Sequence, residues 1–125
     1  MASLIIGTFC GEDRNPNTWI QIYLTVCVCF FAADNQLLGE IPLEVQVLTS
    51  IETFNLASNA LAGPIPNILI QMRNLKIFDV EGNSMSGPAI VNLEDLDQLE
   101  FYHISENRFS GTICPSIGAA FSLKQ

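Results

Sequence analysis

Apolar residues recur along this chain with a spacing typical of short strands repeated at a constant interval. In one segment Met72, Leu75, Phe78 and Val80 are apolar, and the last two stand two positions apart. This spacing predicts a short strand with one buried face, because successive side chains of a strand point to opposite sides. Equivalent apolar residues recur every 24 positions and form four sets: Leu24, Cys27, Phe30 and Ala32; Leu48, Ile51, Phe54 and Leu56; Met72, Leu75, Phe78 and Val80; Leu96, Leu99, Tyr102 and Ile104.

A second recurring segment follows each predicted strand. It begins with an asparagine in every copy, and a glycine stands four positions later. The asparagine side chain can bond neighbouring backbone groups, so a column of such side chains would link successive turns of the chain. The glycine permits a tight bend. The segments read NQLLGEIP at 35–42, NALAGPIP at 59–66, NSMSGPAI at 83–90 and NRFSGTIC at 107–114, which gives a structural column of Asn35, Asn59, Asn83 and Asn107.

The period divides the chain into repeats that depend on one another. A single copy cannot bury its apolar side, whereas stacked copies bury a continuous core. The hydrophobic run at 20–33 falls into the same register, and at roughly 21 Å as a helix it is too short for the about 30 Å of a bilayer core. We predict an N-terminal flank or degenerate cap at 1–23 and a repeat array at 24–125, with copies at 24–47, 48–71, 72–95 and 96–119 and a partial copy at 120–125.

The combined pattern, L-x-x-L-x-L-x-x-N-x-L-x-G-x-I-P, resembles that of plant-type leucine-rich-repeat proteins, as in ectodomains of receptor-like kinases and receptor-like proteins. It is also similar to that of polygalacturonase-inhibiting proteins. The resemblance covers residues 24–125, although Ala89-Ile90 and Cys114 depart from the motif. It implies an α/β repeat solenoid, a right-handed superhelix with a short parallel β-sheet on its concave side and irregular or 3-10 segments on its convex side. The resemblance also implies that ligands meet the concave side or its flank.

Charge narrows the class of partner. The chain carries 13 Asp and Glu against five Lys and Arg, which gives a net charge of −8. This field repels phosphate backbones, and the basic stripe that nucleic-acid binding requires is absent, so we expect no nucleic-acid partner. A basic peptide or a basic protein face suits an acidic chain better.

The residues between the buried ones are expected to face outward in columns that cross the strands. One column holds Cys29, Thr53, Ile77 and Phe101, and the next holds Phe31, Asn55, Asp79 and His103. An apolar centre rimmed by carboxylates suits a basic or amphipathic ligand, whereas the alternative is an ordinary solvated face. The predicted ligand-binding residues on the concave face are Asn55, Ile77, Asp79, Glu81, Phe101, His103, Ser105 and Glu106.

Catalysis and metal binding are not expected. Asp79, His103 and Ser105 share a face, which superficially suggests an acid, a base and a nucleophile. Ser105 is two residues from His103 on one strand, about 6.6 Å away, whereas a hydrogen-bonded nucleophile lies within about 3.2 Å. His103 and Cys29 lie on strands about 14 Å apart, too far for a shared zinc ion. We therefore predict no catalytic residue, no metal site and no small-molecule cofactor.

Three functional hypotheses remain open. The leading one is a protein- or peptide-binding module, a fragment or small relative of a receptor-like ectodomain that serves recognition or signalling, with further leucine-rich repeats or a co-receptor as additional partners. The second is an inhibitor or defence protein of the polygalacturonase-inhibitor type. The third is an intracellular protein-interaction scaffold. The resemblance implies an extracellular or plasma-membrane location, whereas the absence of a convincing signal peptide leaves a cytoplasmic location as the alternative.

Overall fold

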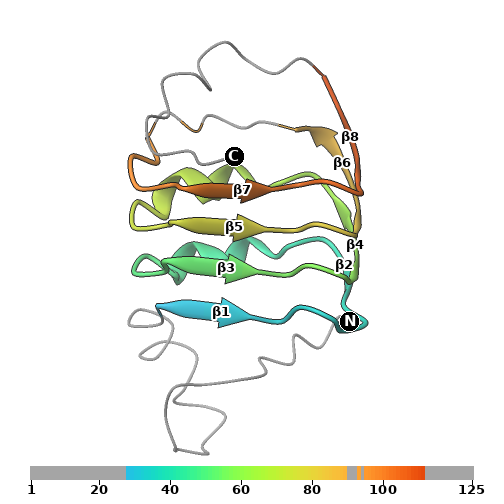
Figure 1. Ribbon diagram of the computed structural model, residues 1–125, viewed down its shortest axis with the longest axis horizontal. Coiled ribbons are helices and arrows are strands. Elements are labelled where there is room, and N and C mark those ends of the chain that lie inside the picture. The colour runs from blue at the N-terminus through green and yellow to red at the C-terminus, as the bar shows by residue number, and fades with distance from the viewer. Residues whose placement is uncertain (1–27, 90–92, 94, 112–125) are drawn as a thin grey trace, which may run out of the picture.

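The fold is a stack of coils in which each coil contributes one strand to each of two parallel sheets (Figure 1). The computed structural model describes residues 28–89, 93 and 95–111. The first sheet has the order β1-β3-β5-β7, with β1 Cys29–Phe31, β3 Thr53–Asn55, β5 Ile77–Asp79 and β7 Phe101–His103. The second has the order β2-β4-β6-β8, with β2 Leu38–Gly39, β4 Ala60–Gly63, β6 Ser84–Pro88 and β8 Arg108–Ser110.

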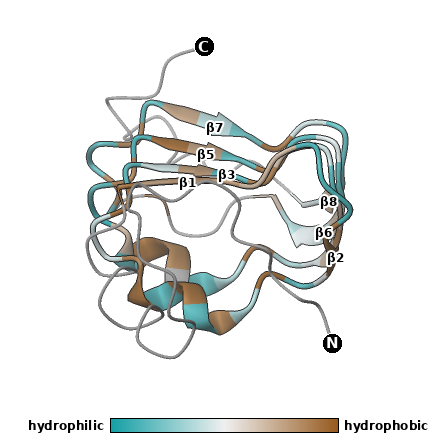
Figure 2. Ribbon diagram, turned by 90° about the horizontal axis from the view of Figure 1, so that it is seen from below, coloured by the Kyte–Doolittle hydropathy of each residue, from teal (hydrophilic) through white to brown (hydrophobic). Residues whose placement is uncertain are grey.

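The side opposite the first sheet is formed by short 3-10 helices (Figure 2). These are η1, Leu43–Val47, and η2, Asn67–Gln71. Each begins after the proline of the Ile-Pro pair, which lies in extended backbone, and each turns its middle apolar residue, Val45 or Leu69, into the core. In the described part of the chain, no helix is long and apolar enough to cross a membrane. The predicted repeat solenoid with a short parallel sheet and 3-10 segments is confirmed, and the second sheet is an element that the apolar period did not predict.

The register of the first sheet follows the 24-residue period. Thr53 pairs with Ile77 and Ile77 with Phe101, while Asn55 pairs with Asp79. The ladder continues beyond the strands, where the Ser58 N–H donates to the carbonyl oxygen of Glu81 at 2.8 Å. A parallel sheet in this register places chemically equivalent positions of successive coils about 4.8 Å apart.

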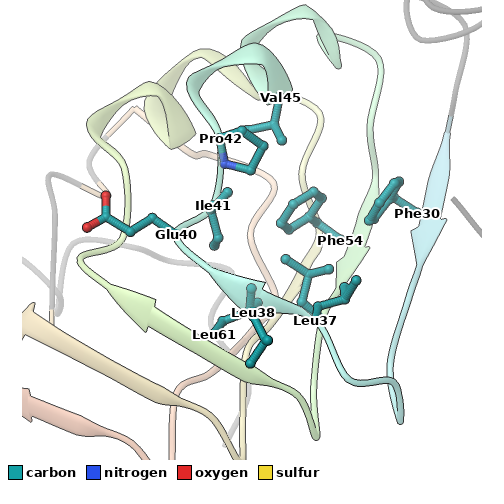
Figure 3. A pocket seen from close by; sticks show the side chains of 10 residues that line it. Phe30, Leu37, Leu38, Glu40, Ile41, Pro42, Val45, Phe54 and Leu61 are labelled. Carbon is teal, nitrogen blue, oxygen red and sulfur yellow. The ribbon is translucent and has the colours of Figure 1, made fainter. Parts of the chain in front are cut away.

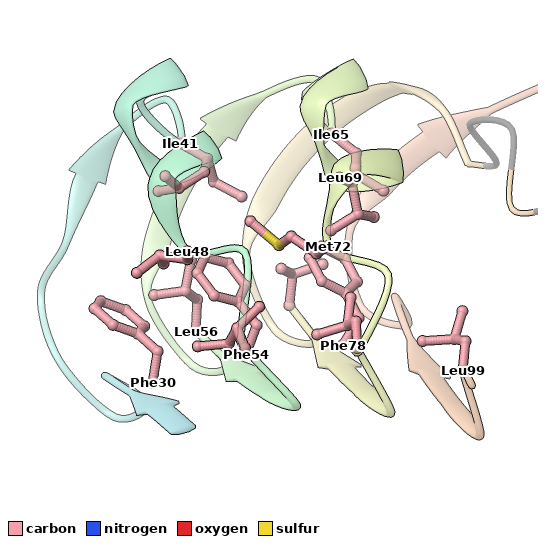
Figure 4. Packing of buried hydrophobic residues seen from close by; sticks show 14 of the residues in the cluster. Phe30, Ile41, Leu48, Phe54, Leu56, Ile65, Leu69, Met72, Phe78 and Leu99 are labelled. Atoms are coloured by element: carbon pink, nitrogen blue, oxygen red, sulfur yellow. The ribbon is translucent and has the colours of Figure 1, made fainter. Parts of the chain in front are cut away.

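The apolar positions of the period form the core (Figure 4). Phe54 and Phe78 are almost fully buried, and their rings stack at 5.9 Å with an interplanar angle of 4°. Phe30 and Tyr102 extend this stack at its two ends, at 5.3 Å and 5.5 Å. Such offset aromatic pairs stabilise a fold by about 0.5–1.5 kcal/mol each beyond the area they bury. The predicted core is confirmed for the described residues, with the last coil less covered, since Tyr102 and Ile104 remain partly exposed.

The asparagine column links the coils. Asn83 is buried, and its side-chain Nδ2 donates to the carbonyl oxygen of Leu56 at 3.0 Å and to that of Val80 at 2.9 Å. Its Oδ1 accepts the N–H of Leu61 at 3.0 Å. One side chain therefore satisfies backbone groups of two coils, and Asn59 and Asn107 repeat the arrangement one coil earlier and later.

Candidate functional site

The outward side of β1, β3, β5 and β7, with the residues that directly follow each strand, is called the concave face here, since family resemblance places this sheet on the concave side. The observed register brings Asp79 next to His103 and Ile77 next to Phe101. Backbone hydrogen bonds from Ser58 to Glu81 and from Gly82 to Ser105 carry the alignment past the strand ends. The expected columns of residues are therefore present, whereas their role in binding remains a proposal.

The apolar centre of the concave face is less exposed than the sequence suggested. Ile77 and Phe101 were expected to be exposed, but both are half-buried. The Phe101 ring lies edge-on to the His103 ring, with centroids 5.9 Å apart and an interplanar angle of 66°. This contact covers part of the aromatic surface and restricts both rings. Half-buried side chains of this kind offer a shallow apolar floor rather than protruding anchors.

Asn55 and Asp79 have a structural task in addition to any binding role. The Asn55 Oδ1 accepts the N–H of Ala57 at 2.9 Å, and the Asp79 Oδ1 accepts the N–H of Glu81 at 3.0 Å. Asn and Asp side chains commonly bond the backbone two residues ahead and so stabilise a turn. This turn-forming role was not predicted from the sequence. The signal was the recurrence of a short polar residue, Asn55 and then Asp79, 24 positions apart and just ahead of the same bend.

That bend explains the end of the concave face. Ser58 and Glu106 adopt left-handed backbone with φ of 54° and 53°, and Gly82 occupies the equivalent position with φ of 68°. A residue other than glycine, Asn or Asp is uncommon in this region. The turn lifts the chain away from the sheet, which leaves the exposed Glu106 side chain at the rim.

His103 and Asp79 are the closest titratable pair on the concave face. The His103 Nδ1 lies 3.5 Å from the Asp79 Oδ2, with the imidazole about half exposed and the carboxylate largely covered. Ser105 is exposed and lies two residues further along the same chain segment. The register therefore brings Asp79 to His103 as expected, and no hydrogen bond among the described residues joins the Ser105 side chain to either of them.

Glu81 completes a cluster that the sequence reasoning did not identify. Potential ligand atoms of Asp79, Glu81 and His103 all lie within 4.8 Å of one another. Cys29, the other metal-binding residue type weighed beside His103, lies three strands away in the sheet order. Glu81 follows Asp79 by two positions and His103 follows it by 24, so the period predicts that these three side chains lie close together.

An ion pair at the start of the strands was also missed. The Lys76 Nζ donates to the Glu52 Oε2 at 2.7 Å, and both side chains are about 40% exposed. The hydrogen bond to Glu52 and its charge raise the pKa of Lys76, with a smaller contribution from Glu100. These three residues are 24 positions apart, so opposite charges alternate across the coils and add specificity to the register.

A separate apolar hollow lies beside the first described coil (Figure 3). It holds about 90 Å³ and is lined mainly by side chains such as Phe30, Leu37, Ile41 and Phe54, with Glu40 at its edge. The large apolar side chains that are exposed among the described residues belong to the same coil: Val28, Phe31, Leu38 and Leu43. Its walls offer few polar groups, and the concave face remains the better candidate for a specific site.

Comparisons with known proteins place this geometry among plant receptor ectodomains. No protein-family model matches the sequence, and no curated protein matches it. Among solved structures, the chain is similar to the leucine-rich-repeat ectodomain of the receptor kinase SOBIR1 from Arabidopsis thaliana, with 27% identity and a TM-score of 0.74. It is also similar to PEPR1 in its structure with AtPEP1, at 31% identity and a TM-score of 0.77. A third is the Arabidopsis receptor kinase HAESA in complex with the peptide hormone IDA and the co-receptor SERK1, at 28% identity and a TM-score of 0.69.

The matches cover most of this chain and a smaller part of each relative. They include 80%, 81% and 73% of the chain, but 54% of the SOBIR1 chain, 14% of the PEPR1 chain and 15% of the HAESA chain. The chain thus spans about half the length of the first relative and a small fraction of the other two. All three relatives are receptor ectodomains rather than enzymes in the region matched.

Proposed function

We propose that this chain, a plant-type leucine-rich-repeat protein similar to receptor-kinase ectodomains, is a recognition module that binds a short peptide or a protein segment on its concave face. The observation that supports this most directly is the juxtaposition of Ile77 and Phe101 on neighbouring strands, beside the carboxylates of Asp79 and Glu81. The proposed contact residues are Asn55, Ile77, Asp79, Glu81, Phe101, His103, Ser105 and Glu106.

The chemistry of this surface favours a basic, partly apolar ligand. Burial of an apolar ligand side chain against Ile77 and Phe101 is favourable, and the flanking carboxylates attract Lys and Arg. The chain as a whole carries a net charge of −8, which increases the rate of encounter with cationic partners at low salt.

The size of the face favours a peptide over a large globular partner. Four strands about 4.8 Å apart and five residues at about 3.3 Å each give a projected area of about 300 Å². A stable protein–protein interface uses roughly 800 Å² on each side. The four described coils alone therefore suit a short segment, or a larger partner that binds weakly.

Two further proposals concern the setting in which this face works. The PEPR1 and HAESA structures contain AtPEP1 and IDA, and the HAESA complex also contains the co-receptor SERK1. By analogy, we propose that a second leucine-rich-repeat ectodomain is an additional partner of this chain. We also propose an extracellular or plasma-membrane location. The second candidate function, inhibition of a cell-wall hydrolase, and the third, an intracellular scaffold, use the same face and differ in the partner.

The test uses short synthetic peptides of random sequence, grouped by net charge and labelled for fluorescence anisotropy. We expect the peptides that bind to be mainly cationic and to lose most of their affinity when Ile77 and Phe101 are both replaced by Ser. The matched control is Leu38→Ser, which removes a large apolar side chain of the second sheet that is 64% exposed. Equal loss of affinity in both variants, or a preference for anionic peptides, would exclude the proposed site.

A further inference from the structure

Three side chains with metal-binding atoms meet where β5 and β7 end. The strand register sets Asp79 beside His103, and Glu81 follows Asp79 by two residues. Their ligand atoms lie within 4.8 Å of one another, and the Asp79 Oδ2 and His103 Nδ1 are 3.5 Å apart. Two ligands of a tetrahedral zinc ion, each about 2.0–2.1 Å from the metal, are about 3.3 Å apart. One pair already has this spacing, and any other separation needs to shorten by no more than about 1.5 Å.

Two of the three groups are oriented by other contacts: Asp79 by a backbone N–H, and His103 by an aromatic ring. The Asp79 Oδ1 accepts the N–H of Glu81 at 3.0 Å, so that Oδ2 is the oxygen turned toward His103. The His103 ring is restricted by its edge contact with Phe101. Hydrogen bonds and contacts of this kind orient metal ligands before the ion binds and raise its affinity. These contacts orient Asp79 and His103 before any ion binds.

Charge gives an independent argument. Two carboxylates stand close together, and the ion pairs among the described residues are Lys76–Glu52 and His103–Asp79. No described Lys or Arg forms an ion pair with Glu81. A divalent cation would neutralise both carboxylates at once, in a chain that is already strongly acidic.

We propose that Asp79, Glu81 and His103 bind a divalent transition-metal ion, with Zn²⁺ as the reference ion. One imidazole nitrogen and two carboxylate oxygens suit zinc and its neighbours, whereas Mg²⁺ and Ca²⁺ favour sites made entirely of oxygen. Three protein ligands leave at least one coordination position open toward the concave face. That position would hold water or a donor atom of a bound ligand. Asp79, Glu81 and His103 are also proposed peptide contacts, but binding of the ion itself needs no peptide. A bound ion would let this face recognise a carboxylate or an imidazole of a ligand as well.

The test is calorimetric titration of the metal-free full-length chain with Zn²⁺ in the absence of any peptide. We expect binding at one site that is weakened at least tenfold by Asp79→Asn and by His103→Gln, about the loss expected when an important metal contact is removed. Asn at position 79 can still accept the N–H of residue 81, as Asn55 does from Ala57, so this variant keeps the turn. Glu44→Gln on η1 removes the same charge from the opposite side and should leave Zn²⁺ affinity unchanged.

Paramagnetic broadening with Co²⁺ locates the site directly, because it acts on nuclei close to the ion. Loss of amide signals from residues 79–81 and 101–105 is expected. Unchanged Zn²⁺ affinity in the combined Asp79→Asn and His103→Gln variant would overturn the proposal, as would broadening only at the cysteines or Mg²⁺ affinity equal to that for Zn²⁺. None of these outcomes depends on peptide binding, so failure here leaves the proposed recognition function standing.

Discussion

The side-chain amide of Asn83 donates to the carbonyl oxygen of Leu56, in the preceding coil, at 3.0 Å. The same side chain accepts the N–H of Leu61 and donates to the carbonyl oxygen of Val80. This one residue thus fixes the separation of two coils at the end of the concave sheet. Since Asn83 also bonds the carbonyl oxygen of Val80, it holds the segment that carries Asp79 and Glu81 against the preceding coil.

Replacing Asn83 by Ala should lower the free energy of unfolding by about 2–4 kcal/mol, because it leaves buried backbone groups of Leu56 and Leu61 without a partner. Urea unfolding followed by circular dichroism measures this. The control is Asn74→Ala, which removes an exposed side chain with one long bond to the carbonyl oxygen of Thr49 at 3.4 Å and should cost less than about 0.5 kcal/mol. Similar losses in the two variants would show that the asparagine column does not hold the coils together.

Gly87 should tolerate a side chain less well than Gly39. Both have left-handed backbone, with φ of 91° and 87°, so that Ala at either position costs about 1 kcal/mol in backbone strain. A Cβ at Gly87 would lie 3.3 Å from the Cβ of Pro64, whereas nothing lies within 4 Å at Gly39. We expect Gly87→Ala to cost about 2 kcal/mol in the same urea measurement, since a rigid proline ring cannot move aside easily. A larger loss for Gly39→Ala would contradict the close approach of the two coils.

Tyr102 should make the fold sensitive to alkaline pH. Its hydroxyl donates to the carbonyl oxygen of Ala89 at 2.9 Å, and burial raises the pKa of the phenol. Because the folded-state pKa is higher than the unfolded value of about 10, the contribution is complete below pH 10 and is lost as the pH rises above it.

Unfolding free energies of the natural chain and of Tyr102→Phe, compared from neutral pH to alkaline pH, test this. The variant should be less stable by about 1 kcal/mol at neutral pH, from the lost hydrogen bond, and the difference should shrink above pH 10. A difference that stays constant through that range would mean that the phenol is not buried as described.

The Lys76–Glu52 pair should contribute little to stability and should respond to salt. Although the hydrogen bond to Glu52 raises the pKa of Lys76, both side chains are about 40% exposed, and water and ions screen their attraction. Lys76→Gln should shift the thermal midpoint slightly at low salt and not at about 1 M NaCl. A shift of equal size at both salt concentrations would point to a packing role of the lysine stem instead.

The strength of the sequence prediction came from the repeat. A 24-residue period constrains the backbone and side chains together, so the sequence alone predicts the register of Phe54, Phe78 and the asparagine column. The second sheet could not, because its strands are two to five residues long and contain Gly39, Gly63 and Gly87. Such short strands form through the stacking of coils and leave little local pattern.

The concave face was predicted in outline and not in detail. The columns follow from the period, whereas the half-buried state of Ile77 and Phe101 depends on side-chain contacts such as the Phe101–His103 pair. The turn-forming bonds of Asn55 and Asp79 depend on the left-handed bend that follows, which no single residue type reveals. The proposed boundaries of the flank at 1–23 and of the partial copy at 120–125 lie outside the described residues, and the domain division remains a prediction.

Hydrogen–deuterium exchange with and without a saturating amount of a bound synthetic peptide tests the central claim most directly. We expect the peptide to slow amide exchange in residues 77–81 and 101–106, on the concave face, and to leave exchange in β4, β6 and β8 unchanged. Protection confined to Ala60–Gly63, Ser84–Pro88 and Arg108–Ser110 would place the ligand on the second sheet and contradict it.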